Sequence, residues 1–202
     1  MAHRVPVLDH PAEAELFGQV LTCHAVLPVQ FVAGERPLMQ QQSEAMLHGL
    51  AVAEDSRGED PDDHGDVPQS MQRLEAKLDL VLSLLGKLAS ERISSLPVRP
   101  LRWSHLGLRV DEGSRSDSRE GDLGVLKLQP VAWLGDHIEL PARVLAVQDN
   151  SDGGRHLWLR FGALTPGLED ALTRHLFRMH RRQVAEARQV ANDPLPWQGR
   201  AG

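Results

Sequence analysis

A basic segment at residues 165–190 carries the densest group of chemically active side chains in this chain. Its cations and imidazoles are Arg174, His175, Arg178, His180, Arg181, Arg182 and Arg188. One interpretation is docking to an acidic partner, which the chain's own acidic loop at residues 55–66 can also supply. The other is a solvated helix face whose cations lie favourably towards the C-terminal end of the helix dipole. The candidates for partner docking are Arg174, Arg178, Arg181 and Arg182.

Other residue patterns give no support to catalysis or to a metal centre. The chain has no G-x-S-x-G, Walker A or zincin motif and no cysteine-rich cluster. His175 and His180 are five residues apart, not the four that place two ligands on one helical face. Cys23 and His24 are adjacent, and adjacent side chains of a strand point to opposite faces. We therefore expect a protein that is not an enzyme and that holds no metal or cofactor.

Composition sets the broad class. The 202 residues are 41% hydrophobic and 25% charged, which is ordinary for one or two small globular domains. The net charge of −6 argues against a nucleic-acid partner. A single cysteine fits a reducing compartment, and no apolar run is long enough to span a membrane. These features predict a soluble cytoplasmic protein.

Residues 67–88 carry an apolar repeat whose spacing alternates between four and three, as in a left-handed coiled coil. The repeat consists of Val67, Met71, Leu74, Leu78, Val81, Leu85 and Leu88. Further leucines at positions 80, 82 and 84 widen this face beyond what a dimer would bury. We expect the helix to assemble the chain into a homo-oligomer, with a tetramer favoured. The alternative is an amphipathic helix packed only on its own domain.

The segment before the repeat predicts one strand and one longer helix. Residues 11–21 can open with a helical turn, and residues 20–32 have the β-branched content of a strand interrupted at Pro28. Residues 37–54 have a helical apolar pattern. We expect this helix to pack along the heptad helix as a hairpin.

Short β-rich runs follow the repeat and predict a small antiparallel barrel or sandwich. The predicted strands are residues 98–103, 106–111, 122–129, 137–148 and 155–162. A helix at 165–190 comes next, with Thr165 as its cap and Pro166 at its first position. Its apolar stripe, which we expect to pack on the barrel, consists of Leu168, Leu172, Leu176 and Met179.

These elements predict an α+β chain in four parts. The parts are an N-terminal strand–helix segment with the acidic loop (1–66), the heptad helix (67–94), a barrel with its terminal helix (95–191) and a tail (192–202). Composition changes sharply at residues 96–100. We therefore expect residues 95–190 to form a self-sufficient module.

The order of these motifs resembles that of a PilZ domain. The resemblance lies in WSHLGLRV at residues 103–110 and in LPARVLAV, LWLRFGAL and LTRHLFRMHRR within residues 140–182. It implies a six-stranded barrel followed by a helix, in a family with many members that bind the bacterial second messenger cyclic di-GMP. The heptad helix is similar to that of atypical, oligomeric PilZ proteins. The resemblance thus implies a PilZ-like barrel preceded by a helical hairpin or coiled coil.

Nucleotide-binding PilZ domains carry an R-x-x-x-R segment before the barrel and a D/N-x-S-x-x-G segment on it. Ser104 and Gly107 match the second segment, but Arg102 stands at its Asp/Asn position. The first segment has no match between residues 68 and 103. The resemblance thus implies Ser104 and Gly107 as ligand-binding residues, and Arg99 and Arg102 are the candidates for a rearranged phosphate clamp beside them. We expect no tight binding of cyclic di-GMP.

The resemblance implies a non-enzymatic signalling adaptor of bacterial cyclic di-GMP pathways. Its expected partners are other copies of itself and a protein of motility or signalling. One alternative is a direct cyclic di-GMP receptor with a rearranged site. Another is an oligomeric scaffold or chaperone with no nucleotide role.

Overall fold

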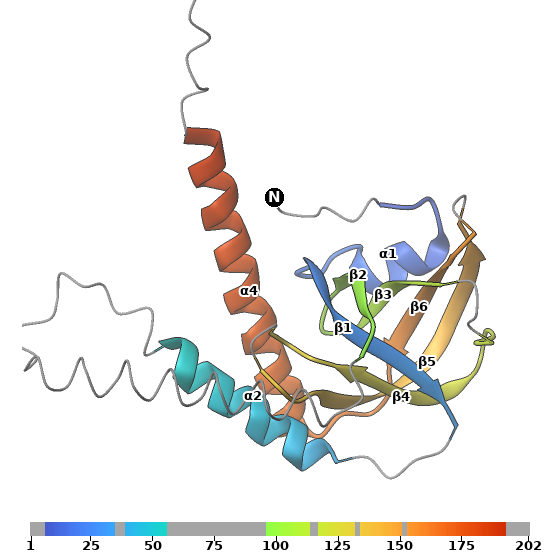
Figure 1. Ribbon diagram of the computed structural model, residues 1–202, viewed down its shortest axis with the longest axis horizontal. Coiled ribbons are helices and arrows are strands. Elements are labelled where there is room, and N and C mark those ends of the chain that lie inside the picture. Colours follow the sequence, from blue (N-terminus) through green and yellow to red (C-terminus); the bar gives the residue numbers. More distant parts are fainter. Residues whose placement is uncertain are drawn as a thin grey trace, which may run out of the picture.

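The described residues form a closed antiparallel β-barrel with helices around it (Figure 1). This computed structural model describes residues 7–34, 39–55, 96–113, 117–131, 134–150 and 153–192. The strands follow one another around the barrel in the order β1-β2-β3-β6-β5-β4. They are β1 (Cys23–Ala33), β2 (Val98–Trp103), β3 (Gly107–Glu112), β4 (Leu123–Leu128), β5 (Ile138–Asp149) and β6 (Arg155–Phe161). The helices are α1 (Pro11–Phe17), α2 (Gln40–Asp55) and α4 (Pro166–Asn192). The predicted barrel with a C-terminal helix is confirmed.

Strand β1 is continuous, so the predicted interruption at Pro28 is wrong. Residues 23–28 of β1 pair with β2, and residues 29–33 pair with β4. Pro28 lies where the strand changes partner, and its carbonyl accepts a hydrogen bond from the Gln129 N–H at 3.0 Å. Proline has no N–H to donate to a neighbouring strand. It is tolerated here because the pairing with β2 ends and the pairing with β4 begins at this residue, so neither set of hydrogen bonds is interrupted.

The barrel closes only through β1, which corrects the expected domain boundary. From sequence this strand belongs to a separate segment, residues 1–66, and residues 95–191 are predicted to contain the whole barrel. Instead β1 lies between β2 and β4. Its side chains at Cys23, Leu27, Val29 and Phe31 are part of the barrel core. The barrel is therefore built from both sides of the heptad segment.

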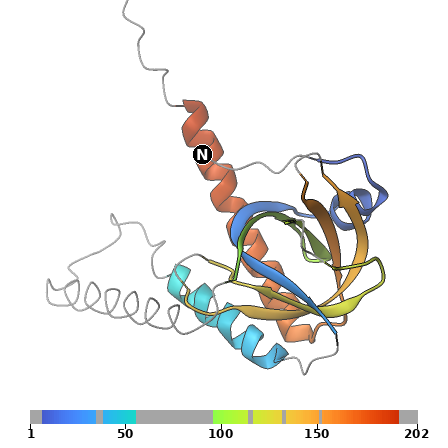
Figure 2. The same ribbon diagram turned by 45° about the vertical axis from the view of Figure 1, so that its right-hand side comes forward.

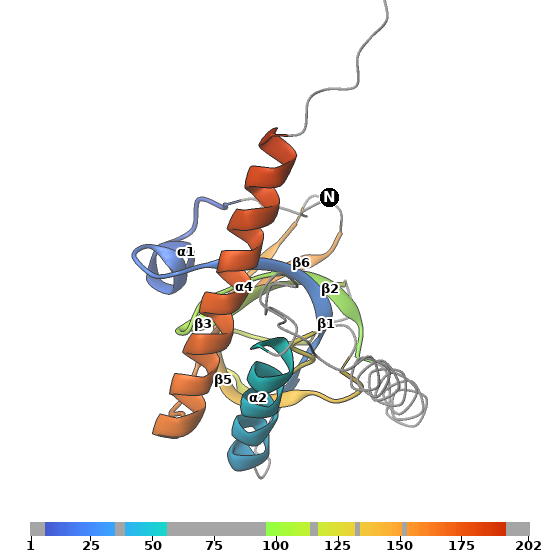
Figure 3. The same ribbon diagram turned by 90° about the vertical axis from the view of Figure 1, so that its left-hand side faces the viewer.

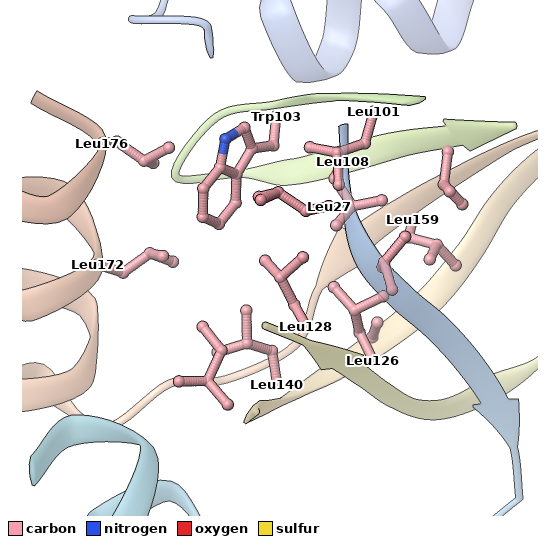
Figure 4. Close-up of a cluster of buried hydrophobic side chains, with 14 of the residues drawn as sticks. Leu27, Leu101, Trp103, Leu108, Leu126, Leu128, Leu140, Leu159, Leu172 and Leu176 are labelled. Atoms are coloured by element: carbon pink, nitrogen blue, oxygen red, sulfur yellow. The ribbon is translucent and has the colours of Figure 1, made fainter. Parts of the chain in front are cut away.

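Alternate residues of each strand fill the barrel interior, and α4 covers it (Figure 4). The apolar stripe of α4 is buried as predicted, with Leu172 fully inaccessible and Leu176 2% exposed. Figure 4 shows both leucines facing Trp103 across the interior. At the start of α4, the Leu168 N–H donates to Thr165 Oγ1 at 3.3 Å, which confirms the predicted cap.

Helices α2 and α4 lie side by side against the barrel (Figure 3). The Glu54 carboxylate near the end of α2 binds two arginines of α4, with Arg178 Nε at 3.1 Å and Arg182 Nη1 at 2.7 Å. Helix α2 thus packs on α4 and β5. Its expected pairing with the heptad helix stays a prediction, because residues 67–88 lie outside the described residues, as do the loop 56–66 and the tail from residue 193. No helix in the described ranges is long and apolar enough to cross a membrane.

A fragment of residues 95–191 should therefore fail to fold cooperatively. Without β1 it lacks the strand that closes the barrel, and both β2 and β4 keep an unpaired edge. Circular dichroism should show no cooperative thermal transition for the fragment, whereas the full chain under the same conditions shows one. A sharp melt of the fragment would mean that the remaining strands close without β1.

Candidate functional site

Neighbouring strands place a row of polar and apolar side chains on the outside of the barrel. Arg102 of β2 pairs with Arg109 of β3, and Arg109 pairs with Trp158 of β6. On the far side of β6, Trp158 is in register with Ala146 of β5. The residues on either side of Arg102 and Arg109 point inward, so the two guanidinium groups and the indole share the outer face.

Helix α1 covers this row (Figure 2) and brings a carboxylate to it. Glu13 Oε2 lies 2.6 Å from Arg102 Nη1, and Glu13 Oε1 accepts a hydrogen bond from Arg109 Nη1. The Trp158 indole N–H donates to the same Oε1 at 3.2 Å. The Glu13 and Arg109 side chains are 5% and 0% exposed. Burying such charges is tolerated only when they are paired and hydrogen-bonded, and this cluster supplies both.

Apolar contacts also hold α1 on this outer face of the barrel. Leu16 and Phe17 of α1 pack with Ala146 and Trp158 in a hydrophobic cluster distinct from the barrel interior. The Arg102 guanidinium lies 4.6 Å from the centre of the Phe17 ring. Burial lowers the pKa of Arg102, Glu13 opposes this and Arg109 adds to it.

Ser104 and Gly107 support α1 at the turn between β2 and β3. The Ser104 hydroxyl donates to the Leu16 carbonyl at 2.7 Å and accepts from the Leu106 N–H at 3.1 Å. A side chain at Gly107 would place its Cβ 2.1 Å from the Leu159 carbonyl oxygen and 3.0 Å from a Leu16 methyl group. Only glycine fits here, because β6 and α1 both come close to its backbone.

The comparisons with known proteins place this arrangement in a family. Residues 47–189 match a family model described as the atypical PilZ domain, cyclic di-GMP receptor. The chain belongs to the atypical PilZ family. One solved structure of this kind is a pathogenic protein from Xanthomonas campestris, described as a new tetrameric PilZ domain self-assembled via an unusual helical bundle. It is 40% identical to this chain and covers 86% of it and 95% of its own length, with a TM-score of 0.72.

More distant PilZ structures also align. The protein YcgR of Escherichia coli with cyclic di-GMP is 19% identical over 46% of this chain and 39% of its own, with a TM-score of 0.39. The PilZ domain of YcgR with the nucleotide is 18% identical over 48% of this chain and 78% of its own, with a TM-score of 0.36. No curated protein matches this chain.

In this PilZ barrel, three of the four predicted ligand residues come together. Arg102, Ser104 and Gly107 all lie beneath α1, and each is in contact with it or leaves space for it. Arg99 does not join them: its Nη1 donates to the Asp111 carbonyl at 3.2 Å, further along the barrel. The role of these residues in ligand binding stays a prediction.

Sequence reasoning missed three members of the site, namely Glu13, Arg109 and Trp158. Arg109 had a signal, since it is the one charged residue in the otherwise apolar run Gly107–Val110. Glu13 had none, because nothing in the order of residues shows that α1 lies on β3 and β6. Trp158 is fully buried beneath α1, outside the barrel interior, where it stacks on His10 with ring centres 4.6 Å apart.

Three of the four predicted docking arginines of α4 form ion pairs within this PilZ structure. Arg178 and Arg182 bind Glu54, and Arg174 Nε lies 3.0 Å from Asp170 Oδ2 one turn earlier. Arg181 is exposed on the same helix. The pattern Arg178–Arg182, spaced as in the R-x-x-x-R segment, thus serves to bind α2 to α4.

His175 of α4 is fully buried and presents its ring edge to Trp103, at 5.8 Å between ring centres. Neither ring nitrogen has a hydrogen-bond partner among the described residues. Burial lowers the pKa of His175 from 6.5 to about 4; Glu54 opposes the shift, and Arg178 and Arg182 reinforce it. The folded chain therefore keeps this imidazole neutral.

Stability should fall as the pH drops from 6.5 towards 4. In that window the unfolded chain protonates His175 and the folded chain does not, so protons favour unfolding. The loss attributable to this residue should approach roughly 3 kcal/mol at pH 4, and it vanishes above the unfolded pKa. Urea denaturation of the wild type and of His175→Leu across this range measures this loss of unfolding free energy.

A His48→Leu control, at an exposed site on α2, should keep the wild-type slope of unfolding free energy against pH. Equal slopes for wild type and His175→Leu would contradict the assignment.

Proposed function

We propose that this protein is a non-enzymatic signalling adaptor that acts in bacterial cyclic di-GMP pathways in the cytoplasm and lacks the standard nucleotide site. The observation that carries the proposal is the position of α1, whose Glu13 pairs with Arg102 and whose Leu16 lies over Ser104 and Gly107. The residues that match the nucleotide segment are thus engaged by the chain itself.

The electrostatic requirements of the nucleotide support this proposal. Cyclic di-GMP is a dianion, and each charge-assisted hydrogen bond to a phosphate contributes about 1.5–3 kcal/mol. The R-x-x-x-R segment that would supply such bonds has no match before the barrel. Arg102, which replaces the Asp/Asn acceptor, would first have to give up its contact with Glu13.

We expect the full chain to bind cyclic di-GMP no tighter than roughly 10 μM, or about −7 kcal/mol. Isothermal titration calorimetry measures this directly. Saturable binding near ~1 μM that Arg102→Ala abolishes and Arg99→Ala leaves intact would overturn the proposal, since Arg99 binds the Asp111 backbone away from α1.

That result would favour the second candidate, a direct receptor with a rearranged site. One observation favours this candidate: Arg102 and Arg109 are paired neighbours on the outer face, and both contact one anionic group, the Glu13 carboxylate. It requires α1 to leave the barrel, because Glu13 now lies between the two guanidinium groups.

Self-assembly through residues 67–88 is the second part of the proposal. The heptad repeat supports it, and so does the Xanthomonas campestris relative, which is described as a tetramer assembled via a helical bundle. A tetramer would present four barrels at once. A motility or signalling partner that binds several barrels would then gain avidity.

The unmodified chain should be a tetramer in light scattering, and Leu78→Asp should split it. Position 78 lies on the seam, where a charge would be buried without a partner. Ser83→Asp is the matched control, because position 83 falls on the outer face of the same repeat and should leave the assembly intact. A monodisperse monomer for the unmodified chain would refute the proposed assembly.

A further inference from the structure

The outer face beneath α1 has the composition of a recognition surface. We call it the α1-binding face and define it by Arg102, Arg109, Ala146 and Trp158, with Ser104 at its edge. It combines one buried and one largely buried guanidinium group, those of Arg109 and Arg102, with an indole N–H donor and apolar carbon. Arginine and tryptophan in such a setting are the residues that contribute most strongly to protein–protein contacts.

Helix α1 shows which ligand this face accepts. Glu13 supplies a carboxylate to the two arginines and the indole, and Leu16 and Phe17, three and four positions later, supply the apolar contacts. Positions i, i+3 and i+4 lie on one side of a helix. The face therefore recognises a short acidic amphipathic helix with the pattern Glu-x-x-Leu-Phe.

Side-chain contacts, and not the helix itself, hold α1 in place. A helix of seven residues is too short to be stable alone in water. The barrel interior forms its own hydrophobic cluster, to which α1 contributes no residue. Helix α1 can thus leave the face without opening the barrel, as a local unfolding event.

We propose that the α1-binding face is a docking site for an acidic amphipathic segment of a protein partner, and that α1 is its built-in competitor. The inference rests on the proposed adaptor function, because it names the chemistry of the partner that an adaptor needs. Charge complementarity supports it, since the neighbouring Arg160 also binds a carboxylate of α1, that of Glu15. Because α1 is tethered through Gly18, its effective concentration is high and a partner must compete with it.

The test adds the α1 segment as a separate peptide. The probe is a fluorescent peptide of residues 7–20, titrated by anisotropy into the full chain and into Glu13→Arg. The new cation would face Arg102 and Arg109, so α1 leaves the face and the peptide should bind at least ~10-fold more tightly than to the wild type. Ala14→Arg is the matched control and should bind as the wild type does, because position 14 is an exposed position of the same helix and belongs to neither the ion pairs nor the apolar contacts of α1.

Changes in the peptide test the recognition itself. A peptide with Glu13→Gln should bind the opened chain at least ~10-fold more weakly than the unmodified peptide. Circular dichroism melts establish that each variant is folded. If Glu13→Arg prevents folding, Phe17→Ala replaces it, because it removes an apolar contact of α1 and keeps the ion cluster.

Two outcomes would overturn the inference. One is a folded, opened variant that binds the peptide no better than the wild type, or that binds the Glu13→Gln peptide equally well; the face would then be only a structural contact. The other is displacement of the peptide by cyclic di-GMP, which would make the face a nucleotide site. Cyclic di-GMP is added only in a separate competition titration, so a failure of the peptide-binding titration itself leaves the adaptor proposal, tested by calorimetry, standing.

Discussion

Two guanidinium groups held side by side on the outside of a barrel need a negative charge if that surface is to be covered. Arg102 and Arg109 are fixed in this position by the register between β2 and β3, and Glu13 supplies the charge. Glu13, Leu16 and Phe17 lie on one side of α1, so the helix that brings the carboxylate to the two arginines also packs Leu16 and Phe17 with Trp158. Ser104 and Gly107 then complete the support. One carboxylate thus links the N-terminal segment to the part of the barrel that resembles a nucleotide site.

Helix α4 is held on the barrel in a different way from α1. There the helix contributes an apolar stripe to the barrel interior, and Glu54 of α2 ties down its two arginines. His175 and Cys23 lie at this junction, where the Cys23 thiol donates to the Leu176 carbonyl at 3.3 Å. Burial raises the pKa of Cys23 to about 12, so the thiol is not reactive at neutral pH. Helix α4 is therefore part of the core, whereas α1 is an attachment to its outside.

Local patterns were enough to predict β2 to β6 and α4. The strands are short β-rich runs separated by turn residues, and α4 begins with a cap and a proline and repeats its leucines at helical spacing. These signals are contained in neighbouring residues. The closure by β1 was not predictable in this way, because its pairing partners lie beyond the heptad segment. Pro28 also misled the prediction, since a proline ends most strands but not one that changes partner at that residue.

The site was less predictable than the fold. A family motif pointed to Arg102, Ser104 and Gly107, and these do lie together. What surrounds them depends on how α1 packs, and a carboxylate in a seven-residue helix gives no sign of its distant partners. A charged residue inside an apolar strand, as at Arg109, is the one signal that sequence reading could have used. It indicates that a charge on that strand must find a partner, but not which one.

The place of β1 in the barrel also has a consequence for how the chain is made. Ribosomes build proteins from the N-terminus at about 5–20 residues per second. Strand β1 emerges early, but β2 begins at Val98 and β4 at Leu123, so β1 waits several seconds at those rates for the neighbours that pair with it. During synthesis its backbone edges and its apolar side chains are open to wrong partners. Closing the barrel over so long an intervening segment also lowers the folding rate, because distant pairings carry a greater loop-closure entropy. Because β1 is the first of these strands to be made and its partners come only after the heptad segment, the nascent chain carries an open strand edge for longer than a barrel built from consecutive strands would.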